Sequence, residues 1–102
     1  MTDKFIEEYK MFLNWGLDSQ VRMCIEEMSE LTKELCKFSR YSNDKEKQKE
    51  IIENIKSEIA DVLNTTEQLE YYFGTEEIEK IRQEKIERGI KKIKNSKEAR
   101  NG

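Results

Sequence analysis

The chain has 102 residues, the length of one domain, and it contains no proline and only four glycines. With 40% of its residues charged, this composition favours helix, and the net charge of −3 gives no general reason to expect nucleic acid as a partner. No run of about 18 apolar residues is present that could span a membrane. Because the N-terminus is too acidic and polar for a signal peptide, we expect a cytoplasmic protein.

The apolar fraction of 35% is low for a self-sufficient globule of this size. Since the apolar residues are periodic, we expect another copy of the chain to cover part of them, in a homodimer or homotetramer. Cys24 and Cys36 lie about 18 Å apart along one predicted helix. That separation is too long for a disulfide, so we expect both cysteines to be reduced.

The first predicted helix covers about residues 3–14, and Trp15 and Gly16 interrupt it. Asp18 or Ser19 is a candidate N-cap for the second predicted helix, which runs to about residue 39. Apolar side chains recur at helical spacing in both segments. These side chains are Phe5, Ile6, Tyr9, Phe12 and Leu13 in the first segment, and Val21, Cys24, Met28, Leu31, Leu35 and Phe38 in the second.

Residues 40–44 are the best loop candidate, and Asn43 or Asp44 is expected to start a third helix over about 45–73. Gly74 has the features of a glycine that ends a helix, and it precedes a fourth helix over about 76–94 with a frayed tail at 94–102. The apolar residues of these helices are Ile52, Ile55, Ile59, Val62, Leu63 and Leu69, then Ile78, Ile81, Ile86, Ile90 and Ile93. We therefore predict a single all-α domain, an antiparallel bundle of about four helices completed by oligomerisation.

Two pairs of carboxylates border these apolar stripes. Glu27 and Glu30 are three residues apart, as are Glu58 and Asp61, so each pair shares a helix face. In two antiparallel helices joined by a short loop, the residue numbers of two facing residues add to a nearly constant value, which is twice the number at the centre of the loop. A loop centred near residues 42–44 gives a value of about 84–88. The numbers of Glu27 and Asp61 add to 88, as do those of Glu30 and Glu58. The two pairs are therefore predicted to lie at the same height.

Converging carboxylates repel one another and need a compensating cation. The chain has no histidine, so the ligands would all be oxygen atoms, which suits Mg²⁺ or Mn²⁺ and argues against structural zinc. Glutamates at this spacing also commonly line solvated faces or pair with lysine. The spacing alone leaves both interpretations open.

The segments EEMSE and EIAD resemble the signature of the MazG-like all-α nucleoside triphosphate pyrophosphohydrolases, Glu-Glu-x-x-Glu followed by Glu-x-x-Asp. The resemblance covers residues 15–69 well and the last helix more loosely. It implies a MazG-like helical bundle that assembles as a dimer or a dimer of dimers. It also implies Mg²⁺-dependent cleavage of a (d)NTP between the α and β phosphates, giving (d)NMP and pyrophosphate.

By position, the resemblance implies that Glu27, Glu30, Glu58 and Asp61 are the metal ligands, with Glu26 in a supporting role. Either Glu27 or Glu30 would orient or deprotonate the attacking water. Lys85 and Arg88 resemble a Lys-x-x-Arg element that would bind phosphate, although cations also suit the solvated C-terminal part of a helix. Trp15, Asn64 and Gln68 are weaker candidates for base or sugar contacts, and the alternatives are packing of Trp15 and hydrogen bonds of the amides across the bundle.

Two other functions remain open at this stage. One is a non-enzymatic helical dimer that acts as an interaction module. The other is a relative that acts on a different phosphoanhydride, such as phosphoribosyl-ATP, although the glycine-containing motif of that enzyme type is not evident. The sequence does not indicate which base or sugar is preferred.

Overall fold

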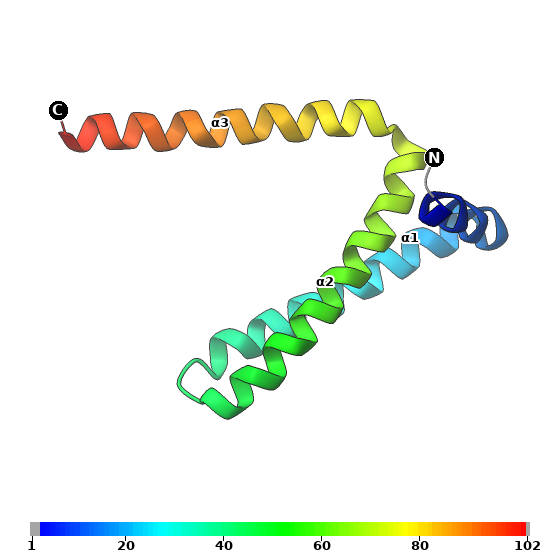
Figure 1. Ribbon diagram of the computed structural model, residues 1–102, viewed down its shortest axis with the longest axis horizontal. Helices are drawn as coiled ribbons and strands as arrows, with labels where there is room; N and C mark the ends of the chain where they lie inside the picture. Colours follow the sequence, from blue (N-terminus) through cyan, green and yellow to red (C-terminus); the bar gives the residue numbers. More distant parts are fainter. Residues whose placement is uncertain (1–2, 102) are drawn as a thin grey trace. The chain divides into compact units, whose positions relative to one another are not determined.

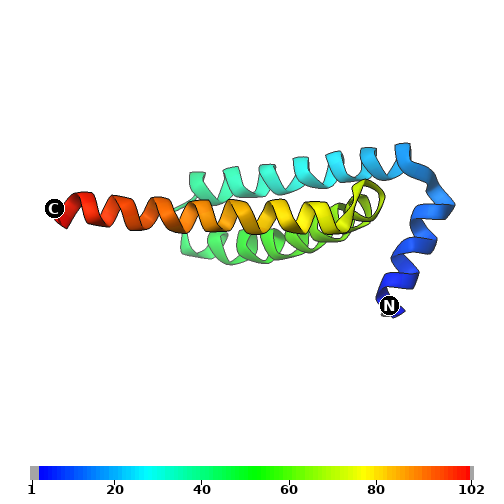
Figure 2. The same ribbon diagram turned by 90° about the horizontal axis from the view of Figure 1, so that it is seen from above.

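The computed structural model describes residues 3–101, which form three helices (Figures 1 and 2). They are α1 (Asp3–Arg40), α2 (Lys45–Phe73) and α3 (Thr75–Asn101). No strand occurs among the described residues, so the all-α prediction is confirmed. The chain divides into two compact units at Leu69 and Glu70, and each unit is described by itself below.

Helix α1 is broken at Gly16, whose backbone has a φ of 79° and a ψ of 168°. Glycine tolerates this conformation because it has no Cβ, whereas other residues are strained there. The predicted interruption is therefore confirmed, and α1 has two helical parts. Asp18 and Ser19, the predicted N-caps, lie inside the second part, which starts directly after the glycine.

The second part of α1 and helix α2 form an antiparallel hairpin, joined by residues 41–44 (Figure 1). The Asp44 carboxylate accepts a hydrogen bond from the backbone N–H of Lys47 at 3.1 Å, which confirms Asp44 as the N-cap of α2. The Gln48 amide donates to the carbonyl oxygens of Phe38 at 2.8 Å and Tyr41 at 2.7 Å. These bonds tie the end of α1 to the start of α2 and help to fix the register of the hairpin.

In the first unit, the buried residues between 14 and 69 are mostly polar, which the hydrophobic periodicity does not predict; the side chains of the predicted apolar stripe over residues 5–13 lie outside the part whose burial is described. The apolar residues Cys24 and Ile51 are buried, and so are four polar ones, Gln20, Glu34, Thr65 and Gln68. Much of the predicted apolar stripe is instead exposed. We call the following exposed set the hairpin apolar face: Ile25, Met28, Leu35, Ile52, Ile59 and Leu63.

This difference has a simple geometric cause. One row of α1 faces α2, and its members recur at steps of four and three positions. These members are residues 20, 24, 27, 31 and 34. Met28 and Leu35 each follow a member of the row by one position, so they are turned about 100° away from it. Periodicity predicted the helices correctly, but it did not show which of two adjacent rows packs within the hairpin.

Helix α3 begins after Gly74, whose φ is 115° and whose N–H donates to the carbonyl of Glu70 at 2.9 Å. This confirms Gly74 as the residue that ends α2. Helix α3 continues to Asn101, so the predicted helix end near residue 94 is wrong, while fraying of residues 94–102 stays a prediction. The physical reason is that residues 90–101 include neither glycine nor proline and so contain no stop signal.

Charges along α3 interact locally. Arg82 forms an ion pair with Glu79 at 2.8 Å, and both side chains remain largely exposed. A hydrogen bond with Glu70 and the pairing with Arg82 lower the pKa of Glu79 below its usual value. Within the described part of the chain, no helix has the length and apolar character required to cross a bilayer.

Candidate functional site

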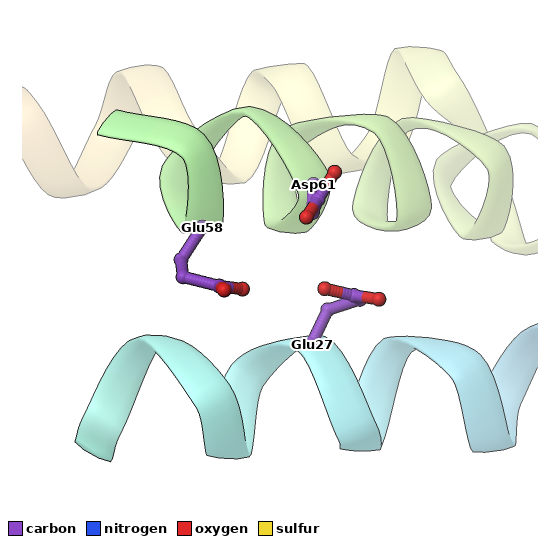
Figure 3. Close-up of side chains that lie close together, drawn as sticks. All are labelled: Glu27, Glu58 and Asp61. Atoms are coloured by element: carbon purple, nitrogen blue, oxygen red, sulfur yellow. The ribbon is translucent and has the colours of Figure 1, made fainter. Parts of the chain in front are cut away.

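Three carboxylates meet between α1 and α2 (Figure 3). Glu27 comes from α1, and Glu58 and Asp61 come from α2. One oxygen of each carboxylate lies within 4.8 Å of one oxygen of each of the others. Glu27 and Glu58 are half-buried and Asp61 is exposed, so the cluster lies at the edge of the space between the two helices.

The register of the hairpin brings these carboxylates together. Glu27 faces Asp61 as the sequence predicted, and Glu58 lies one turn from Asp61 on the same helix. Glu30, the fourth predicted ligand, is exposed and is not a member of this group of three. Its charge still acts on the cluster, because it helps to raise the pKa of Glu27.

Burial and negative neighbours raise the pKa of the Glu27 carboxyl above its usual value of 4.5. Desolvation is the largest cause, followed by the charges of Asp61 and Glu58, a hydrogen bond with Asp61 and the charge of Glu30. Each cause disfavours a further negative charge at this position. The cluster is thus an electrostatically unfavourable arrangement that a cation would relieve.

No side chain supplies that cation within the described residues. No lysine or arginine there forms an ion pair with Glu27, Glu58 or Asp61. One oxygen of Glu58, Oε2, is buried and has no hydrogen-bond partner among the described atoms. Carboxylate oxygens are suitable ligands for Mg²⁺ or Mn²⁺, so the residues present fit a hard divalent cation.

Two buried amides, those of Gln20 and Gln68, lie two helical turns from the carboxylates. Of these two residues, only Gln68 was predicted from the sequence. Gln20 is 0% exposed and Gln68 is 4% exposed, and their numbers add to 88 like those of Glu27 and Asp61. Neither amide oxygen has a hydrogen-bond partner among the described atoms. Gln20 was missed, although its spacing of seven residues from Glu27 placed it on the same face.

The remaining candidate residues are mostly exposed. Trp15 is 46% exposed directly before the break in α1, and Glu26 and Asn64 are exposed on α1 and α2. Lys85 and Arg88 are exposed on α3, which belongs to the second unit. The structure therefore brings together three of the predicted residues and leaves the roles of the others as predictions.

No protein-family model matches the chain, and no curated protein or solved structure matches it significantly. The MazG-like resemblance accordingly rests on the residues of this chain alone.

Proposed function

We propose that this protein is a Mg²⁺-dependent nucleotide pyrophosphohydrolase that cleaves a (d)NTP to (d)NMP and pyrophosphate. The observation that carries the proposal is the convergence of Glu27, Glu58 and Asp61 to within 4.8 Å without a cationic partner among the described residues. The raised pKa of Glu27 and the unpartnered Oε2 atom of Glu58 support it. The order of the acidic residues in EEMSE and EIAD gives the reaction class by resemblance.

The chemistry follows from the charges. A nucleoside triphosphate is polyanionic, so an acidic site can hold it only through bound cations. When bound, Mg²⁺ (or Mn²⁺) would polarise the α-phosphoryl oxygens and neutralise the leaving pyrophosphate. Glu27, Glu58 and Asp61 would hold the cation, while Glu30, outside the group of three, would accept the proton of the attacking water or add a fourth ligand.

In this reaction, the water oxygen bonds to the α-phosphorus and the bond from that phosphorus to the bridging α–β oxygen breaks. Pyrophosphate leaves with the electron pair of that bond. Lys85 and Arg88 are the candidates for binding the outer phosphates. Trp15, Asn64 and the buried amide of Gln68 are the candidates for contacts to the base or sugar.

The proposal includes a homo-oligomer, either a dimer or a tetramer. It is supported by the hairpin apolar face, because a soluble chain seldom leaves so many large apolar side chains in water. The same exposure also supports the second candidate function, a non-enzymatic helical dimer that acts as an interaction module. The two functions differ in whether the carboxylates bind metal and substrate.

Release of pyrophosphate from a panel of (d)NTPs with Mg²⁺ tests the proposal. We expect wild-type activity on at least one (d)NTP and a loss of at least about a hundredfold in Glu58→Gln and Asp61→Asn. The reason is that the metal supplies several kcal/mol to the transition state, and about 1.4 kcal/mol is a factor of ten.

The matched control is Glu50→Gln, which removes an exposed carboxylate from the same helix and should retain wild-type activity. Activity that survives both Glu58→Gln and Asp61→Asn would remove the site assignment. Absence of activity on every (d)NTP would favour the interaction module.

A further inference from the structure

The C-terminal half of helix α3 carries an apolar stripe that its own unit leaves exposed. Ile86, Ile90 and Ile93 recur at steps of four and three residues, so they share one face of the helix. These residues are 53%, 55% and 59% exposed. Three neighbouring isoleucines on one exposed helix face indicate a contact surface.

The same segment is strongly cationic. Residues 85–100 contain seven Lys or Arg and two Glu, a net charge of +5. None of these cations forms an ion pair among the described residues: Lys85, Arg88, Lys91, Lys92, Lys94, Lys97 and Arg100. Lys97 and Arg100 continue the face of the isoleucines, and Lys94 borders it. The surface that covers this face should therefore be both anionic and apolar.

An anionic lipid surface has both properties. Helices that lie on a bilayer place their apolar side chains below the headgroups, while lysines and arginines extend their alkyl chains and reach the headgroup anions. Clusters of about four to eight Lys or Arg on an amphipathic helix are typical of binding to anionic lipids. A nucleic acid would neutralise the cations but leave the isoleucines in water. A second copy of α3 would cover the isoleucines but bring like charges together.

The negative charge of the remaining chain does not prevent this contact. The net charge is −3 for the whole chain and +5 for residues 85–100, so the other residues carry −8. At physiological ionic strength, salt screens charges that are more than about 8 Å apart in water. The cations on the isoleucine face would lie at the lipid surface itself, so they determine the attraction.

We propose that α3 binds peripherally to an anionic membrane surface. Ile86, Ile90 and Ile93 enter the boundary between headgroups and acyl chains, and the cations of the same face, Lys94, Lys97 and Arg100, contact the lipid phosphates and carboxylates. This inference is independent of the proposed function, because it uses neither the carboxylate cluster nor the candidate phosphate ligands on α3.

Co-sedimentation with vesicles tests the cationic part of the proposal. We expect the whole chain to bind vesicles of phosphatidylcholine and phosphatidylserine but not vesicles of phosphatidylcholine alone, and to dissociate as NaCl is added. Lys94→Gln/Lys97→Gln should bind at least about tenfold more weakly. The matched control is Lys33→Gln/Lys45→Gln, which removes two exposed cations of the hairpin, gives the same net charge and should bind like wild type.

Ile90→Ala/Ile93→Ala tests the apolar part. Alanine favours helix, and circular dichroism checks that the helix content is retained. We expect this variant to bind the phosphatidylserine vesicles at least about tenfold more weakly than wild type, because each substitution removes carbon atoms that would enter the bilayer. Binding to a fluorescent duplex DNA is measured in parallel and should be much weaker than binding to the vesicles.

The other possible results would each overturn the proposal. Equal binding to both kinds of vesicle, or to neither, would exclude recognition of anionic lipid, as would equal losses in the two lysine variants. Binding to DNA without binding to vesicles would identify a nucleic-acid surface. An oligomer that dissociates in Ile90→Ala/Ile93→Ala, with no vesicle binding by wild type, would identify a contact between copies. None of these results depends on (d)NTP cleavage, so they leave the proposed function unaffected.

Discussion

Leu63→Lys is expected to dissociate the protein into poorly folded monomers. Leu63 is 61% exposed in the single chain, and Ile25 lies at about the same height on α1. On a monomer, such a surface change would alter stability by no more than about 0.5 kcal/mol. In an oligomer that covers this face, the lysine would be buried without a partner, at a cost of about 3–5 kcal/mol.

The small apolar core explains why this effect should be large. Among the residues whose burial the structure describes, 7, 10 and 14–100, Cys24 and Ile51 are the buried apolar ones, whereas fourteen large apolar residues are exposed. We therefore expect stable folding of this part of the chain to depend on a partner chain.

Sedimentation velocity and urea unfolding, measured over a range of protein concentrations, check this result. Ser57→Lys is the control, since it places a lysine at an exposed position of the same helix outside the hairpin apolar face. A wild type that is monomeric at all concentrations, with Leu63→Lys as stable as Ser57→Lys, would show that the face is not an interface.

Glu27→Gln is expected to stabilise the metal-free protein at neutral pH. Burial and the neighbouring carboxylates raise the pKa of Glu27 in the folded state above its value in the unfolded chain. Between these two pKa values the folded state binds more protons, so the free energy of unfolding falls as pH rises through that window. The loss is complete once the pH exceeds the folded-state pKa, and replacement of the carboxylate by an uncharged glutamine amide removes it.

Thermal unfolding in the presence of a chelator, followed across pH, measures this effect. The melting temperature of Glu27→Gln should exceed that of wild type at pH 7, and the difference should vanish well below pH 4.5, where the carboxyl is protonated in both states. Glu50→Gln, at an exposed position, should show no such difference. A destabilised Glu27→Gln at pH 7 would mean that Glu27 stabilises the fold and does not strain it.

The sequence predicted the parts of the fold that local chemistry determines. Asp44 caps α2, and Gly16 and Gly74 break the helices where predicted, because each residue acts on its own backbone. The position of the loop predicted the register, and the register brought Glu27 opposite Asp61. These features depend on the local sequence and not on which surfaces pack against the helices.

The features that the sequence did not predict depend on packing between helices. The buried row of α1 contains Gln20 and Glu34, and hydrophobic periodicity favoured the neighbouring row with Met28 and Leu35. Glu30 shares a helix face with Glu27 at a spacing of three residues but remains outside the cluster, since the cluster depends on side-chain direction as well as height. The sequence therefore predicted that the second part of α1 packs against α2, but not which faces of these two helices are in contact.

Titration of Mn²⁺ into metal-free protein, with the free ion followed by electron paramagnetic resonance, tests directly whether the three carboxylates bind a divalent cation. If Glu27, Glu58 and Asp61 form a metal centre, wild type should bind Mn²⁺ saturably, and Glu58→Gln should bind at least about tenfold more weakly. Mg²⁺ should displace the bound Mn²⁺. Equal binding by wild type and Glu58→Gln, or no saturable binding by either, would show that Glu27, Glu58 and Asp61 are not a metal centre.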